Sequence, residues 1–192
     1  MGFDPNGVRP ARGAEPLNLY ALVIYLPEPL GSILDELRLE MVPGCNPHAH
    51  ISVLPPRPLL STPQEAIAEA HNAMAGFPPF EIELGQIELF PVTDVIYISV
   101  EGGTTQLRQM HRTLNQGALA YEEPFPYHPH LTLAQELPPG RVQPLFELAN
   151  RRWRQFRGPR TFRAEHTVFV RNTRGNQWTD LASSPLRAVP VS

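Results

Sequence analysis

The sequence predicts an α+β fold of two pseudo-symmetric lobes, each an antiparallel sheet with helices packed outside it, which face each other across a central cleft. Two local patterns lead to this prediction: period-two alternation of apolar residues, typical of strands, and helical spacing between those stretches. The third observation is a repeated order of elements. In both halves of the 192-residue chain a helix is followed by a strand that carries histidine, a second helix and a pair of strands.

The first half contains six predicted elements. They are a strand at 17–26, a helix at 31–41, a strand at 48–54, a helix at 62–75 and strands at 80–90 and 95–100. Ser32 is a candidate N-cap of the first helix, and Thr62 of the second, where Pro63 occupies the first helical position. The last two strands are separated by a short turn, so we expect them to pair antiparallel.

The second half repeats this order. Its predicted elements are a helix at 104–120, a strand at 128–134, a helix at 143–156 and strands at 162–171 and 178–181, with a turn at 172–176. Because the two histidine strands occupy equivalent places in the repeat, we expect them to meet at the floor of the cleft.

The predicted domain organisation is simple. Residues 1–16 form a flexible N-terminal tail, 17–183 a single bilobed domain and 184–192 a C-terminal tail. The chain shows neither a signal peptide nor an apolar run of the ~20 residues that would span a membrane, so we expect a cytoplasmic protein without a membrane partner. A monomer is the expected state, since both lobes belong to one chain. The single cysteine, Cys45, excludes an internal disulfide.

Two short motifs carry the chemistry. His50 and Ser52 form one pair and His130 and Thr132 the other, each separated by one apolar residue. In a strand, residues two apart share a face and lie roughly 7 Å apart, so each motif presents an imidazole and a hydroxyl together. A third match, at His111, lies in a stretch with helical spacing and is set aside.

Two histidines and two hydroxyls in one cleft suit phosphodiester hydrolysis. Imidazole titrates near neutral pH, so one ring can deprotonate the attacking water while the other protonates the leaving oxygen. The hydroxyls of Ser52 and Thr132 can donate hydrogen bonds to the non-bridging oxygens as charge develops there. This scheme requires no metal and no cofactor. The net charge of −3 argues against broad affinity for long nucleic acid.

The chain resembles the 2H phosphoesterase superfamily, close to the branch of bacterial 2′-5′ RNA ligases and RNA 2′,3′-cyclic phosphodiesterases. The matching pieces are LNLYALVIYLP, the motif HISV, FEIELGQIELFPVTDVIYISV, the motif in EPFPYHPHLTLAQ and HTVFVRNTRGNQWTDL, which together span about residues 17 to 183. The resemblance implies a bilobed α+β fold and a metal-independent site that opens 2′,3′-cyclic phosphates of nucleotides or RNA ends. It implies the catalytic set His50, Ser52, His130 and Thr132, with the acid and base roles left open.

The chain departs from this family in its positive charge. Many relatives carry a basic residue directly after the second motif, where this sequence has Gln135. Phosphate binding must then use another cation, and Arg57 and Arg171 are the candidates. Tyr97 and Phe169 lie on strands expected to border the cleft, where they either stack on a base or pack in the core.

Three alternative functions stay open. The first is a nucleotide- or RNA-binding module that keeps the cleft but turns over little. The second is a 2′-5′ RNA ligase, as in part of the family. The third is a metal-dependent hydrolase, because His48 and His128 lie two residues before the motif histidines and would share their faces.

Overall fold

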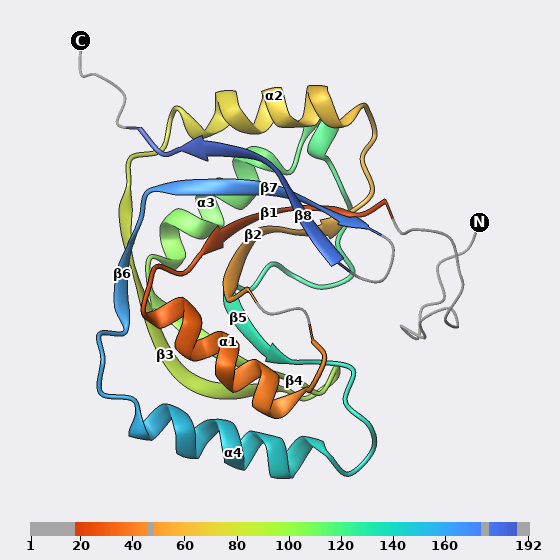
Figure 1. Ribbon diagram of the computed structural model, residues 1–192. Helices are drawn as coiled ribbons and strands as arrows, with labels where there is room; N and C mark the ends of the chain where they lie inside the picture. Colours follow the sequence, from red (N-terminus) through yellow and green to blue (C-terminus); the bar gives the residue numbers. More distant parts are fainter. Residues whose placement is uncertain (1–17, 46–47, 174–176, 188–192) are drawn as a thin grey trace.

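The computed structural model describes residues 18–45, 48–173 and 177–187, and it confirms the α+β fold with two antiparallel four-stranded sheets (Figure 1). The strands are β1 (Tyr20–Tyr25), β2 (His50–Arg57), β3 (Phe80–Phe90), β4 (Val95–Gly102), β5 (His130–Ala134), β6 (Thr161–Ala164), β7 (His166–Thr173) and β8 (Gln177–Pro185). The helices are α1 (Leu30–Met41), α2 (Pro63–Met74), α3 (Thr104–Leu114) and α4 (Val142–Gln155), with a 3₁₀ turn, η1, at Gly117–Leu119. The predicted tail at 1–16 lies outside the described residues.

The histidine strands are the edge strands that join the two sheets. The first sheet has the order β2-β1-β7-β8 and the second the order β5-β4-β3-β6. Strands β2 and β5 contact each other, so the histidines of the two motifs reach the same region from opposite sheets. Helices α1 and α4 cover the second sheet, while α2 and α3 pack against the first (Figure 1).

The repeat in the sequence does not coincide with the two sheets, because each half gives its last strands to the other sheet. The pair β3 and β4 lies in the second sheet beside β5, and the pair β7 and β8 lies in the first sheet beside β1. The single strand predicted at 162–171 is therefore wrong. It consists of β6 in the second sheet and β7 in the first, and the chain crosses between the sheets at the exposed Glu165.

Local chemistry explains how the helices begin and end. Thr62 caps α2 as predicted, in a reciprocal capping box with Glu65. Ser32 does not cap α1, because the helix already begins at Leu30 and the Ser32 amide instead donates to the Glu28 carboxylate at 3.3 Å.

Helix α3 ends earlier than predicted, at Leu114. The side chain of Asn115 bonds to both backbone groups of Tyr121, and Gly117 adopts a positive φ of 57° that breaks the helix.

The main core lies between the sheets and the helices that cover them, and a second, smaller cluster lies on the other face of the first sheet. Ala21 and Val23 of β1 and Val168 and Val170 of β7 form this second cluster, with Tyr25 and Trp178 packed against it. Because β1 is flanked by strands on both sides and covered on both faces, nearly all of it is buried. Ordered structure continues past residue 183, since β8 runs to Pro185 and Leu186 is buried. None of the helices in the described residues is long and apolar enough to cross a membrane.

Candidate active site

The first motif lies on β2, where His50 and Ser52 share one half-buried face. Ile51 and Val53 point into the core on the opposite face. On the neighbouring strand β1, Tyr25 stands opposite His50 and Val23 opposite Ser52. Directly opposite residues of paired strands share a face, so the site includes part of β1.

The second motif repeats this arrangement on β5. His130 and Thr132 are half-buried on one face, with their apolar neighbours in the core. On β4, Ser99 stands opposite His130 and Tyr97 opposite Thr132. Each histidine strand therefore presents an imidazole, a hydroxyl and two residues of its inner neighbour.

Both imidazoles are oriented in the same way. Nδ1 of His50 lies 2.7 Å from the carbonyl oxygen of His48, and Nδ1 of His130 lies 2.6 Å from that of His128. A carbonyl oxygen only accepts hydrogen bonds, so each Nδ1 carries the proton and donates it. In the neutral rings, Nε2 is then the basic atom.

Burial keeps both rings neutral at pH 7 in the free protein. It lowers the pKa of His50 to about 4, against the opposing effect of the His48 carbonyl bond. The positive charge of Arg38 lowers it further. Burial also lowers the pKa of His130 below its ordinary value, and the charge of a protonated His128 acts in the same direction.

Aromatic rings hold the segment around the first motif. Tyr25 stacks on His48, with 3.6 Å between the ring centroids and 12° between the planes. Its hydroxyl donates a 2.7 Å hydrogen bond to Asp180 on β8. These contacts tie the segment that supplies the carbonyl for His50 to the first sheet.

A different aromatic pair borders the second motif. Phe90 stacks on Tyr97 at 4.0 Å, and its ring meets that of His130 edge-on at 5.1 Å. The Tyr97 hydroxyl donates a 2.7 Å hydrogen bond to Glu88. Tyr97 lies beside His130 as predicted for a cleft residue, but only 4% of it is exposed, so its ring is mostly used in packing.

A pocket of about 80 Å³ opens on the face of the first sheet that carries the first motif. It is lined by Ala21, Val23, Tyr25, His48, His50, Ser52, Pro56, Val170 and Trp178. Its floor is apolar, and its aromatic residues come from β1 and β8. Tyr25 and Trp178 are not among the site residues predicted from the sequence, although Tyr25 follows Val23 in strand alternation.

Arg57, predicted to bind phosphate, lies elsewhere. Only 1% of it is exposed, and its guanidinium forms an ion pair with Glu123. It also donates to the Asn115 side chain at 2.8 Å and to the carbonyl oxygens of Leu119 and Pro55 at 3.0 Å each. The charge predicted to bind substrate is thus already neutralised, and it fixes the segment between α3 and β5.

The two candidates on β7 also point away from the pocket. Phe169 is 2% exposed and stacks on Tyr20 in the main core, with 5.9 Å between the centroids. Arg171 lies two residues further along the same strand and therefore on the same face as Phe169. Val170 between them faces the pocket instead.

A network of side chains that the sequence does not predict joins the two motifs. The Tyr127 hydroxyl donates a 2.8 Å hydrogen bond to the carbonyl oxygen of Ser52. The Tyr127 ring stacks on His111 at 4.0 Å and 3°, and His111 Nε2 lies 2.8 Å from the carboxylate of Glu123, which also binds Arg57. His111, set aside as a catalytic candidate, thus supports the tyrosine that bridges β2 to the segment before β5.

Within the part of the chain that the structure describes, His, Cys, Asp and Glu side chains form no group of three or more that could hold a metal ion. The rings of His128 and His130 are 6.3 Å apart and tilted by 40°. His48 is occupied by its stacking contact with Tyr25.

Comparison with known families agrees with the geometry. The sequence model of the 2′-5′ RNA ligase superfamily matches residues 27–178, a range that includes both histidine motifs, the whole second sheet and strands β2 and β7 of the first. The chain belongs to this superfamily. The predicted resemblance to the 2H phosphoesterases is confirmed.

Curated bacterial relatives show weaker, partial similarity. A protein of Geobacillus thermodenitrificans named "Putative phosphoesterase" is 30% identical over 99 residues, which are 47% of this chain and 57% of the relative. "Putative phosphoesterase GK0864" of Geobacillus kaustophilus is 27% identical over 128 residues, 62% of this chain and 70% of the relative. The chain thus spans little more than half the length of the first of these.

Solved structures share the fold over nearly their whole length. TT0787 of Thermus thermophilus superposes with a TM-score of 0.65 at 20% identity, covering 88% of this chain and 98% of that one. E. coli LigT complexed with phosphate gives a TM-score of 0.62 at 15% identity, with coverage of 91% and 99%. LigT complexed with 3′-AMP gives 0.61 at 15% identity, with coverage of 88% and 98%.

Proposed function

We propose that this member of the 2′-5′ RNA ligase superfamily is a metal-independent phosphodiesterase that opens 2′,3′-cyclic phosphates of nucleotides or RNA ends. The observation that carries the proposal is the matched pair of imidazoles. His50 and His130 each donate Nδ1–H to a carbonyl oxygen two residues earlier, on edge strands that contact each other. Two neutral imidazoles held in the same tautomer are an arrangement for proton transfer, which binding alone does not need.

The proposed step moves two protons and exchanges one bond at phosphorus. One histidine takes a proton from water at Nε2, and the water oxygen forms a bond to phosphorus. The bond from phosphorus to one ribose oxygen breaks, and the other histidine, protonated at Nε2, gives its proton to that oxygen. The product is a nucleoside 2′- or 3′-phosphate. Ser52 and Thr132, beside the two rings, donate hydrogen bonds to the non-bridging oxygens.

The two faces of the site favour a small substrate. The pocket beside His50 offers Tyr25 and Trp178 for contact with a sugar or base. The face of the second sheet is acidic, because Glu88 pairs across the strands with Tyr97, which pairs with Thr132, so all three share one face.

The acidic face extends along β3 and β4. Glu81, Glu83 and Glu101 are exposed, alternating with side chains buried in the core. Glu81 forms an ion pair with Arg163 at 3.5 Å. The other three carboxylates repel a long polyanion, whereas a cyclic mononucleotide brings a single negative charge. LigT, which shares this fold, has been crystallised with phosphate and with 3′-AMP. LigT has also been crystallised with ATP and with NADP+, so these likenesses support a nucleotide ligand.

The test is hydrolysis of 2′,3′-cyclic mononucleotides and of an oligonucleotide with a cyclic phosphate end, with a chelator present. The variants are His50→Ala and His130→Ala, and His166→Ala is the matched control because it removes an exposed histidine at the start of β7. The proposal predicts turnover in chelator that both site variants lose and the control keeps.

Two results would replace the proposal. Folded wild-type protein that binds both substrates but turns over neither, with or without added metal, would indicate a binding module. Conversion of a 5′-hydroxyl and a cyclic phosphate end into a 2′-5′ linkage, in place of hydrolysis, would indicate a ligase.

A further inference from the structure

The proposed site needs a cation that the motifs do not provide. An oligonucleotide end or cyclic nucleotide carries a negative phosphate, yet the residue after the second motif is Gln135, which is exposed and neutral. Arg57 is paired with Glu123, and Arg171 shares the face of Phe169 away from the pocket. Both histidines are neutral in the free protein, because burial lowers their pKa values.

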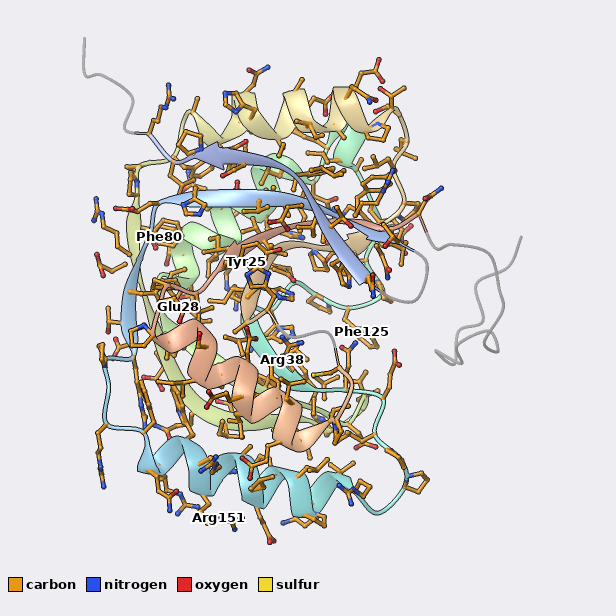
Figure 2. All side chains as sticks on the ribbon, viewed as in Figure 1. Tyr25, Glu28, Arg38, Phe80, Phe125 and Arg151 are labelled. Carbon is orange, nitrogen blue, oxygen red and sulfur yellow. The ribbon has the colours of Figure 1, made fainter. Side chains whose placement is uncertain are left out.

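Arg38 is a cation near the site whose guanidinium is poorly satisfied. It lies on α1, the helix that contacts β5, and Figure 2 shows it on the flank of α1 next to that strand. Its side chain is 13% exposed. The Nε and Nη1 atoms are buried without a hydrogen-bond partner.

Its one ion pair among the described residues is weak. The nearest carboxylate oxygen, from Asp35 one helical turn earlier, lies 3.6 Å from Nη1, beyond ordinary hydrogen-bond length. That Asp35 oxygen is itself buried and has no hydrogen-bond partner. At this distance the pair lacks the planar, two-bonded contact that a guanidinium makes with an oxyanion.

A buried guanidinium with unused donors is costly unless a ligand completes it. Desolvating a charged group without hydrogen bonds is unfavourable, and buried polar groups in folded proteins are nearly always paired. The positive charge of Arg38 lowers the pKa of His50 and the carboxylate of Asp35 raises it, so both side chains lie within electrostatic range of His50. An oxyanion bound beside His50 would supply the acceptors that Arg38 lacks.

We propose that Arg38 binds the phosphate of the substrate beside His50, as the substrate-binding cation that the second motif lacks. This inference rests on the proposed function for the identity of the substrate, but its ligand chemistry, an oxyanion of phosphate, is testable separately. When no phosphate is bound, the Asp35 carboxylate is then the anion nearest to the guanidinium.

The experiment measures the binding of inorganic phosphate to the full chain by titration calorimetry at pH 7.5, with chelator present. Arg38→Gln removes the charge and is expected to weaken phosphate binding about tenfold or more, the loss typical of a charge-assisted hydrogen bond. Arg38→Lys keeps the charge but lacks the planar guanidinium, so its phosphate affinity is expected to lie between those of wild type and Arg38→Gln. Arg151→Gln is the matched control, since Arg151 lies on the outward side of α4 (Figure 2), and should change affinity less than about twofold.

Asp35→Asn is expected to change phosphate affinity in the opposite direction to Arg38→Gln. If Asp35 competes with phosphate for Arg38, this variant binds phosphate a few times more tightly than wild type. If Arg38 and Asp35 form only a structural pair, the variant loses stability and phosphate affinity stays the same or falls. Because the Asp35 carboxylate also acts at His50 directly, a gain in affinity that persists when Asp35→Asn is combined with Arg38→Met would overturn the role of Arg38.

The outcomes separate the inference from the proposed function. Wild-type turnover of a cyclic phosphate with unchanged phosphate affinity in Arg38→Gln and Asp35→Asn overturns the role of Arg38 and leaves the function standing. If phosphate binding depends on Arg38 but no cyclic phosphate is turned over, the role of Arg38 in binding phosphate is supported and the proposed reaction is contradicted.

Discussion

The Tyr127 hydroxyl donates a 2.8 Å hydrogen bond to the backbone carbonyl oxygen of Ser52. Tyr127 directly precedes His128, whose own carbonyl oxygen orients the imidazole of His130. One side chain therefore fixes the segment that orients the second histidine to the strand that carries the first. Stacking on His111, which is bound to Glu123, holds the Tyr127 ring in place.

Tyr127→Phe removes only this hydroxyl. We expect the free energy of unfolding to fall by about 1 kcal/mol, the contribution of one hydrogen bond, and kcat to fall about tenfold while KM changes little. Urea unfolding and steady-state kinetics on a 2′,3′-cyclic nucleotide measure both effects. Tyr121→Phe in the same segment is the control, because the backbone of Tyr121, and not its ring, bonds to Asn115. Equal kcat values for Tyr127→Phe and Tyr121→Phe would contradict the role of the Tyr127 hydroxyl in positioning the histidines.

The lowered histidine pKa values predict an acidic optimum for kcat/KM. Catalysis needs one histidine neutral and the other protonated, and in the free protein the pKa of His50 is about 4 and that of His130 is below its ordinary value. As pH rises through the higher of the two, the proton donor is lost, so kcat/KM should decline about tenfold per pH unit toward pH 8. A bound phosphate raises both values, so kcat should decline at higher pH than kcat/KM does. An optimum of kcat/KM above pH 7.5 would contradict this account.

The hydroxyls are expected to act on the transition state. Ser52→Ala and Thr132→Ala should each lower kcat by about 10- to 100-fold, because each removes one donor to the developing charge. Ser52→Thr keeps the donor and should retain most activity. Variants with unchanged kcat and raised KM would show that the hydroxyls contact only the ground state.

Arg57 should be structural. Arg57→Gln removes the buried guanidinium and leaves the partly buried Glu123 with His111 as its partner, and we expect a loss of about 3 kcal/mol in the free energy of unfolding. Arg112→Gln, which removes an exposed charge from α3, should be within about 0.5 kcal/mol of wild type. If Arg57 instead binds phosphate, its variant raises KM strongly without a comparable loss of stability.

The acidic face should discriminate by substrate length. We expect kcat/KM for a cyclic mononucleotide to exceed that for an oligonucleotide with the same end at low salt, because the glutamates repel further phosphates. The triple variant Glu81→Gln, Glu83→Gln, Glu101→Gln should speed the oligonucleotide reaction by several-fold and leave the mononucleotide reaction nearly unchanged. A wild-type preference for the oligonucleotide would show that RNA follows another face.

The sequence predicts the local features of this site better than its surroundings. Alternation places His50 with Ser52 and His130 with Thr132, since the period of a strand is a local property. Alternation does not reveal that the chain passes from the second sheet at β6 to the first sheet at β7, because the choice of partner strand depends on contacts between distant residues. The same limit applies to charge. Arg57 and Arg38 look alike in the sequence, and only packing makes one a satisfied ion pair and the other a guanidinium with unused donors.

The most direct test of the account compares kcat/KM on a 2′,3′-cyclic nucleotide, with chelator present, for wild type, His50→Ala, His130→Ala and the double variant. If the histidines act together as acid and base, each single variant loses nearly all activity and the double variant loses little more, because residues of one catalytic unit are not additive. If either single variant keeps substantial activity, or if the losses simply multiply, the two-histidine mechanism is contradicted.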